Sequence, residues 1–215
     1  MNLDRILPAA DRQAVEAAVR AAEARTGCQI VVTVVPACDD YQHAAWKGAT
    51  FGALAAALMV GLYSRGLEVW GVVWAWLLLP APVGAVLGFF LARNATVRRG
   101  LVTPEVGRRR VESRAAEAFL EAGVHRTATH RGVLLFLAVF ERRVVVLADD
   151  GVRVRLPAPA LDAVASAVSE GMASAGTGAA LVRGVERCAA VLAEHGFAGS
   201  GGGPNELPDA VRVEE

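Results

Sequence analysis

The stretch THRGVLLFLAVFERRVVVLADDG, from Thr129 to Gly151, decides the fold of this chain. Its first part, GVLLFLAVF, is a run of mostly apolar residues without alternation, which is typical of a strand covered on both faces. The polar tripeptide ERR predicts a tight connection, and VVVLADD predicts an antiparallel strand that returns beside the first. The end of the second strand is therefore expected next to the beginning of the first.

The segments on either side of this hairpin alternate between helix and strand patterns. Residues 7–27 have apolar positions at helical spacing, and the β-branched run 28–37 predicts a buried strand. Three further helices are expected at residues 104–123, 160–175 and 178–196. Strands separated by helices imply an α/β fold with a small, mainly parallel sheet that carries one antiparallel hairpin.

Two stretches without charge explain why the chain is 54% hydrophobic with a mean hydropathy of +0.38. Residues 69–92 are long enough to cross a hydrocarbon core, and residues 50–64 reach that length by including Trp46 and Lys47. Because only RGLE separates them, they predict an antiparallel transmembrane hairpin over residues 44–92. Two prolines permit a kinked or re-entrant second span, and two buried helices of a soluble bundle are the alternative.

The positive charge lies on one side of these stretches. Six arginines follow the second stretch, at 93, 98, 99 and 108–110, whereas the tip of the hairpin offers Arg65 beside Glu68. The positive-inside rule therefore predicts an integral protein of the inner or cell membrane whose soluble domain is cytoplasmic. A net charge of zero and the lack of aromatic residues around Arg108 to Arg110 argue against nucleic acid and favour membrane lipid as a partner.

The predicted organisation has four parts. Residues 1–43 and 93–197 form one soluble α/β domain that is discontinuous in sequence, and residues 44–92 form the transmembrane hairpin between them. Residues 198–215 contain glycine, proline and acidic residues but no apolar period, which predicts a disordered, Gly-rich acidic tail.

A first group of polar residues is expected at one end of the central hairpin. Antiparallel pairing brings Asp149 and Asp150 towards Thr127, His130 and Arg131. The carboxylates suit a hard cation such as Ca²⁺ or Mg²⁺, and the basic side chains suit a phosphate or carboxylate ligand. The alternative is an ion pair between Arg131 and Asp149 that closes the sheet without any ligand.

A second group follows the first strand. Asp39 and Asp40 are candidate metal ligands at the carboxyl edge of the parallel strands, where Glu141 is also expected. Either aspartate is equally explained as the N-cap of the next helix. The aromatic and imidazole side chains beside them are equally explained as membrane-interface anchors: Tyr41, His43 and Trp46.

These motifs resemble the TPM domain family. The pattern TxxxRGVLLFLAVFERRVVVLAD at residues 127–149 is followed by Met172 and by LAEHGF at 192–197, and AEARTGCQIVV at 22–32 leads to DDY at 39–41. The likeness is closest to the bacterial membrane branch that carries two inserted transmembrane helices. The segment SAGTGAAL departs from the family, because relatives often carry an aromatic and a basic residue there.

The resemblance implies several activities. Members of the family outside this branch are linked to thylakoid photosystem repair, acid phosphatase activity, binding of calcium or other divalent cations, and regulation of a receptor. The function expected here is a membrane-anchored TPM-like domain that acts as a protein-interaction or envelope quality-control adaptor for a membrane or envelope protein. The alternative is a divalent-metal-binding domain with acid-phosphatase-like activity and Ca²⁺ or Mg²⁺ as its cofactor. Substrate, partner and oligomeric state are not specified by the sequence.

Overall fold

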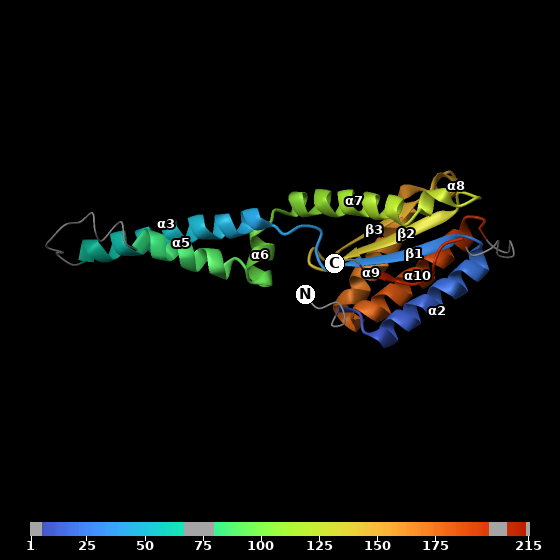
Figure 1. The fold of residues 1–215 in the computed structure, drawn as a ribbon, viewed down its shortest axis with the longest axis horizontal. Coiled ribbons are helices and arrows are strands. Elements are labelled where there is room, and N and C mark those ends of the chain that lie inside the picture. The colour runs from blue at the N-terminus through green and yellow to red at the C-terminus, as the bar shows by residue number, and fades with distance from the viewer. Residues whose placement is uncertain (1–5, 67–79, 198–205, 214–215) are drawn as a thin grey trace. The chain divides into compact units, whose positions relative to one another are not determined.

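The computed structural model describes residues 6–66, 80–197 and 206–213, and the chain divides into two compact units (Figure 1). The first, called the α/β unit, comprises residues 1–38 and 108–215. The second, called the helical unit, comprises residues 39–107.

The α/β unit is built on a four-stranded sheet with the order β3-β2-β1-β4. Strand β1 pairs in parallel with β2 and with β4, whereas β2 pairs antiparallel with β3. The strands are β1 (Gln29–Val35), β2 (Gly132–Ala138), β3 (Arg143–Ala148) and β4 (Arg212–Val213). This arrangement confirms the predicted mixed α/β fold with a mainly parallel sheet and one antiparallel hairpin.

Strand β2 is the centre of the sheet, as its uninterrupted apolar sequence predicted. All seven of its residues are buried, because helices cover both faces. Side chains alternate between two cores: Leu135 and Leu137 lie in the larger one, while Leu134 and Phe136 lie in the smaller one. A polar residue on either face would therefore lose its contact with water.

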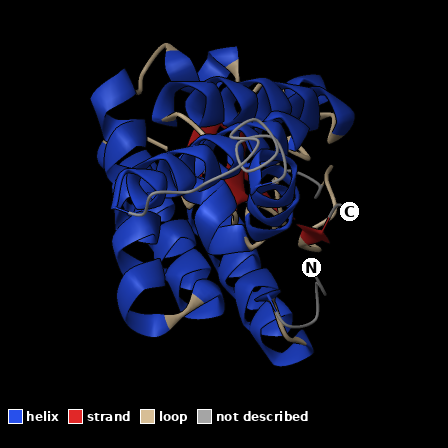
Figure 2. Cartoon of the chain, turned by 90° about the vertical axis from the view of Figure 1, so that its left-hand side faces the viewer, coloured by secondary structure: helices blue, strands red, loops and turns tan. Residues whose placement is uncertain are grey.

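Helices form the two outer layers. Helices α2 (Ala9–Thr26), α9 (Ala158–Ala175) and α10 (Thr177–Glu194) contribute to the larger core on one face, and α7 (Pro104–Glu121) contributes to the smaller core on the other (Figure 1). Two short helices, η1 (Val124–Arg126) and α8 (Asp150–Arg153), flank the central hairpin. Figure 2 marks the helices in blue and the strands in red.

Two positions with positive φ fix the chain reversals that the sequence indicated. Helix α2 ends at Gly27, whose φ of 66° lets its N–H reach the Glu23 carbonyl oxygen at 2.8 Å. The ERR connection closes through Arg142, which adopts a φ of 51°. Both features are local solutions to ending an element without leaving backbone groups unpaired.

Residues 206–213 correct the prediction of a disordered tail. Their backbone returns to the sheet, where β4 pairs with Thr33 and Val34 of β1. The Gln29 side-chain oxygen accepts hydrogen bonds from the N–H groups of Glu206 and Leu207, both at 3.1 Å. These contacts are long-range, so the local composition gave no sign of them. Residues 198–205 and 214–215 of the predicted tail lie outside the described residues.

The helical unit contains α3 (Gln42–Gly66), α5 (Pro80–Leu91) and α6 (Ala95–Leu101). A glycine seam, consisting of Gly48, Gly52, Gly84 and Gly88, joins α3 to α5. Gly48 lies against Gly88, and Gly52 lies against Gly84, so the two helices run antiparallel. A Cβ atom on any of the four would collide with a backbone carbonyl oxygen of the opposite helix. The seam therefore allows an approach that larger residues forbid.

The segment Gln42–Tyr63 is, within the described residues, the one helix long and apolar enough to cross a membrane. Only 6% of the most apolar 18-residue stretch of this helix is buried inside the structure. Helix α5 is a shorter apolar helix, and residues 67–79, which include the tip of the predicted hairpin, lie outside the described residues. The prediction of two membrane spans is thus not confirmed. One of the two predicted apolar helices, α3, is long and apolar enough to cross a membrane.

Candidate functional site

Asp149 lies at the junction between β3 and α8. Its Oδ1 accepts a hydrogen bond from the Asp150 N–H at 2.8 Å, which caps the short helix α8. Its Oδ2 lies 3.2 Å from His130 Nδ1, and its own N–H donates to the Gly132 carbonyl oxygen at 2.9 Å. The antiparallel hairpin thus brings Asp149 to His130, as its register requires.

The loop that carries His130 is held in an unusual conformation. His130 adopts a φ of 51°, and its N–H donates to the Thr127 carbonyl oxygen at 3.0 Å. Gly151, at the start of α8, lies directly over this loop, because a Cβ there would collide with the His130 carbonyl oxygen. Glycine at 151 therefore lets α8 pack closely against the loop. This packing keeps the His130 imidazole beside the Asp149 carboxylate.

The other residues of this predicted group have different roles. The Arg131 guanidinium lies 5.8 Å from the centre of the Phe197 ring. Within the described residues, the side chain that pairs with Asp149 is His130, so the expected ion pair between Arg131 and Asp149 is not formed. Thr127 is buried and its Oγ1 has no hydrogen-bond partner among the described residues, while Asp150 is exposed.

The contact between Asp149 and His130 is the part of this group with chemical potential. The Asp149 side chain is 8% exposed and the His130 side chain is 63% exposed. A buried carboxylate that binds Nδ1 orients the imidazole, which leaves Nε2 able to accept a proton or a ligand. The described residues contain no group of three or more His, Cys, Asp or Glu side chains able to hold a metal ion. The assignment of Asp149 and Asp150 as metal ligands stays a prediction.

The second predicted group leads into α3. Asp39 Oδ1 accepts a hydrogen bond from the Tyr41 N–H at 3.3 Å, and Tyr41 has a φ of 48° with a fully buried ring. Asp39 thereby engages backbone just before the helix begins, and the metal assignment of Asp39 and Asp40 stays a prediction. In the α/β unit, Glu141 Oε1 accepts a hydrogen bond from the Cys38 N–H at 2.9 Å.

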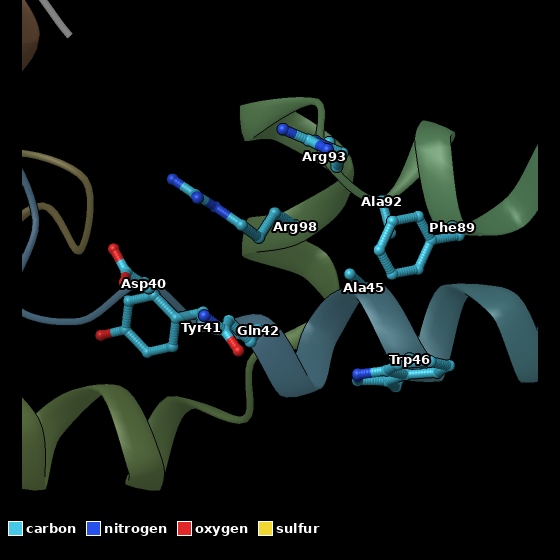
Figure 3. Close-up of a pocket in the computed structure, with 9 residues that line it drawn as sticks. All are labelled: Asp40, Tyr41, Gln42, Ala45, Trp46, Phe89, Ala92, Arg93 and Arg98. Carbon is cyan, nitrogen blue, oxygen red and sulfur yellow. The ribbon is translucent and has the colours of Figure 1, made fainter.

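Asp40 lines a pocket of about 540 Å³ in the helical unit (Figure 3). The walls come from the N-terminal part of α3, the C-terminal part of α5 and the following segment with α6. The lining residues are Asp40, Tyr41, Gln42, Ala45, Trp46, Phe89, Ala92, Arg93 and Arg98. No sequence spacing indicated this pocket, because its two arginines lie after the end of α5, with Arg93 in the turn and Arg98 on α6.

A third group, absent from the sequence analysis, lies where the C-terminal segment meets α2. Glu23 Oε1 accepts a hydrogen bond from the Ile30 N–H at 2.7 Å. Burial raises the pKa of Glu23 to about 7, against the opposing effect of the Ile30 hydrogen bond, and the nearby Asp209 carboxylate raises it further. No sequence spacing connects two residues so far apart in the chain, so only the fold could reveal this pair.

Cys28 and Cys188 of the α/β unit are buried, and neither forms a disulfide. Burial raises the pKa of the Cys28 thiol to about 11 and that of the Cys188 thiol to about 12. Both thiols therefore stay protonated at neutral pH, whereas a nucleophilic cysteine needs to be a thiolate.

The fold described above defines a mixed α/β protein, and part of the chain matches the model of a known family. Residues 95–191 match the family model of the TPM domain, which confirms the predicted resemblance for that part of the chain. The solved structures include an NMR structure of the BA42 protein from the psychrophilic bacterium Bizionia argentinensis. It aligns with a TM-score of 0.60 at 16% identity, over 99% of this chain and 99% of that one. This likeness shows a shared fold. No curated protein matches the chain.

Proposed function

We propose that this protein is a membrane-anchored TPM-like domain of the bacterial membrane branch, in which α3 and α5 enter the membrane as a hairpin. The observation that carries the proposal is the distribution of side-chain size in the helical unit. Most large apolar side chains of α3 and α5 are more than half exposed, while glycines occupy the contact between the two helices. The exposed residues include Phe51, Leu54, Leu58, Met59, Val86, Leu87, Phe90 and Leu91.

This distribution disfavours the alternative of two buried helices in a soluble bundle. In water, an amphipathic helix places its large apolar residues against a partner and its small or polar residues outside. In lipid, the surroundings are as apolar as leucine, so association depends on close backbone packing at small residues. The glycine seam with an apolar exterior fits the second case.

The basic residues support a cytoplasmic location of the segments that flank the hairpin. Lys47 lies near the start of α3, and its Nζ donates to the Leu101 carbonyl oxygen at 3.3 Å. Arg93, Arg98 and Arg99 follow the end of α5. Both ends of the hairpin therefore carry positive charge, which the positive-inside rule associates with the cytoplasm.

For the α/β unit, the proposed role is binding of a membrane or envelope protein as an adaptor. The support is that Asp149, the best-placed carboxylate for chemistry, already caps α8 and holds His130. Strand β3 lies at an edge of the sheet in the order β3-β2-β1-β4, and an edge strand can accept a strand from another protein. The acid-phosphatase alternative predicts hydrolysis of a phosphate monoester that Asp149→Asn abolishes, whereas an adaptor shows no such turnover.

Alkaline carbonate extraction of membranes from cells that express the full chain tests the anchor. We expect the wild type in the membrane pellet and the double variant Leu54→Lys, Leu58→Lys in the supernatant, because each lysine near a helix centre costs about 3 kcal/mol of insertion free energy. A matched control makes the same kind of change at exposed apolar residues of the α/β unit, Leu120→Lys and Val154→Lys. Wild-type protein in the supernatant would refute the anchor.

A further inference from the structure

The pocket in the helical unit has polar groups at one end and apolar groups at the other. Figure 3 shows that Arg98 extends to the side of the pocket where Asp40 lies, that Phe89 and Ala92 lie at the opposite side, and that Arg93 lies between them. Trp46 joins the apolar side, since its ring centre lies 5.6 Å from that of Phe89 in an edge-to-face contact. A ligand that fills the pocket must therefore be amphipathic.

The charges of the pocket define the sign of that ligand. Two guanidinium groups and one carboxylate leave a net charge of one positive unit along the walls. A single anionic group, such as the phosphodiester of a lipid, balances this charge. Arginine is the side chain best suited to it, because the planar guanidinium donates two parallel hydrogen bonds to phosphate oxygens.

The position of the pocket on α3 matches the level of a lipid headgroup if the proposed anchor is right. Asp40 and Gln42 precede the apolar run of α3, and Phe51, with a side chain that is 61% exposed, lies within that run. Tryptophan at this boundary, like Trp46, is typical of the zone between headgroups and acyl chains. Basic pockets between membrane helices on the cytoplasmic side bind anionic lipid headgroups in other proteins.

We propose that this pocket is a binding site for one anionic phospholipid, with Arg93 and Arg98 on its phosphodiester and the first acyl carbons against Phe89 and Trp46. The volume of about 540 Å³ accommodates a headgroup with its glycerol backbone. Gln42 and Asp40 lie at the polar end, where they meet the hydroxyl groups of a glycerol headgroup. The inference rests on the proposed membrane anchor and adds a specific lipid class to it.

Native mass spectrometry of the full chain in non-ionic detergent tests the site. Phosphatidylglycerol, phosphatidylcholine and inorganic phosphate are titrated separately, and the bound copies are counted. We expect one retained phosphatidylglycerol and weak retention of phosphatidylcholine. Inorganic phosphate is expected to bind weakly as well, because it lacks the apolar part. Binding of inorganic phosphate as tightly as of the lipid would overturn the lipid assignment.

Variants assign the binding to the pocket. Arg93→Gln and Arg98→Gln are each expected to weaken phosphatidylglycerol binding about tenfold, since each removes a charge-assisted contact. Arg98→Lys keeps the charge but loses the paired hydrogen bonds, so its binding is expected between that of wild type and Arg98→Gln. Arg153→Gln removes one exposed positive charge outside the pocket and is expected to leave binding unchanged. Equal loss in Arg153→Gln, or no loss in the Arg93→Gln, Arg98→Gln double variant, would overturn the proposal.

Failure of the site and failure of the anchor give different results. If the double arginine variant and wild type both stay in the membrane pellet after carbonate extraction but bind phosphatidylglycerol equally, the pocket is not the lipid site and the anchor stands. If wild type itself leaves the pellet, the anchor fails, and the lipid proposal falls with it.

Discussion

The two units of this chain sort side chains by size in opposite ways. In the α/β unit the largest apolar side chains are innermost, and Phe136 and Leu135 have no exposed surface. Where α3 and α5 of the helical unit meet, glycines are innermost, while Leu58 and Met59 are 63% and 70% exposed. The same residue types thus occupy opposite positions within one chain. The difference supports the proposed anchor, because large apolar residues are buried in water and can face outward in lipid.

The aromatic residues allow the two units to be measured separately. All four tryptophans and both tyrosines occur between residues 39 and 107, so near-ultraviolet absorption and fluorescence report on the helical unit. The α/β unit contains phenylalanine but no tryptophan or tyrosine. Its stability is therefore followed by hydrogen exchange detected by mass spectrometry.

The largest expected difference comes from truncating one large side chain in each unit. Phe136→Ala leaves a cavity in the smaller core and is expected to lower the unfolding free energy of the α/β unit by about 3–5 kcal/mol. Leu58→Ala removes an exposed side chain and is expected to change the stability of the helical unit by less than about 0.5 kcal/mol in detergent. Hydrogen exchange and tryptophan fluorescence provide the two measurements. A large loss for Leu58→Ala would show that this residue packs against something.

The reverse substitution tests the glycine seam. Gly88→Val places a side chain against the Gly48 carbonyl oxygen, and we expect it to destabilise the pair of helices by about 1–3 kcal/mol or more. Gly61→Val is the matched control on the same pair of helices, because a Cβ at Gly61 meets no atom of the described residues within 4 Å. Thermal unfolding in detergent, followed by tryptophan fluorescence, compares the two variants. Equal melting temperatures of the two variants would mean that the stability of the α3–α5 pair does not depend on close packing at the glycine seam.

The sequence predicted the sheet well because its signals are local. The apolar run of β2, the ERR connection and Gly27 each act over a few residues, and each is found in the structure. Strand β4 was missed because only two residues pair, and their contacts are with residues near the other end of the chain. The glycine seam carried a visible signal, a four-residue spacing of glycines on both helices, that the sequence analysis did not use.

The candidate sites were less predictable than the fold. Pairing of the hairpin strands placed Asp149 near His130 correctly, because register determines that approach. It could not predict that Arg131 would lie over Phe197, since that choice depends on where the segment after α10 ends. The pairing of Glu23 with Asp209 depends on the same return of the C-terminal segment.

Glu23 makes the stability of the α/β unit depend on pH. Its pKa of about 7 in the folded chain exceeds the ordinary value of 4.5, so the folded state binds more protons between these two values. The stabilisation is fully present below pH 4.5 and is lost as pH rises through 7. Because solvent screens a half-buried carboxyl group, we expect a loss of about 1–2 kcal/mol. The tryptophan signal of the helical unit should not follow it.

Substitution of this residue by glutamine checks the assignment. Glu23→Gln keeps an oxygen that can accept the Ile30 hydrogen bond but cannot ionise, so the dependence on pH should flatten across the same range. Glu112→Gln changes an exposed glutamate on α7 and should preserve the slope. Hydrogen exchange of the α/β unit at pH 5 and pH 8, corrected for the intrinsic exchange rates, measures both variants. If the stability of Glu23→Gln depends on pH as strongly as that of the wild type, another group causes the effect.

The smallest expected effect distinguishes a helix cap from a metal ligand at Asp149. Asp149→Ala removes the acceptor for the Asp150 N–H and should cost about 1 kcal/mol, whereas Asp149→Asn retains a capping oxygen and should cost less. Neither substitution should alter the helical unit. If the residue only caps α8 and orients His130, Ca²⁺ and Mg²⁺ leave the melting temperature of all three proteins unchanged. If it binds a metal, either ion raises the melting temperature of the wild type and not of Asp149→Asn, because a ligand selective for the folded state stabilises it. In that case the carboxylate has a second role that the contacts with Asp150 and His130 do not explain.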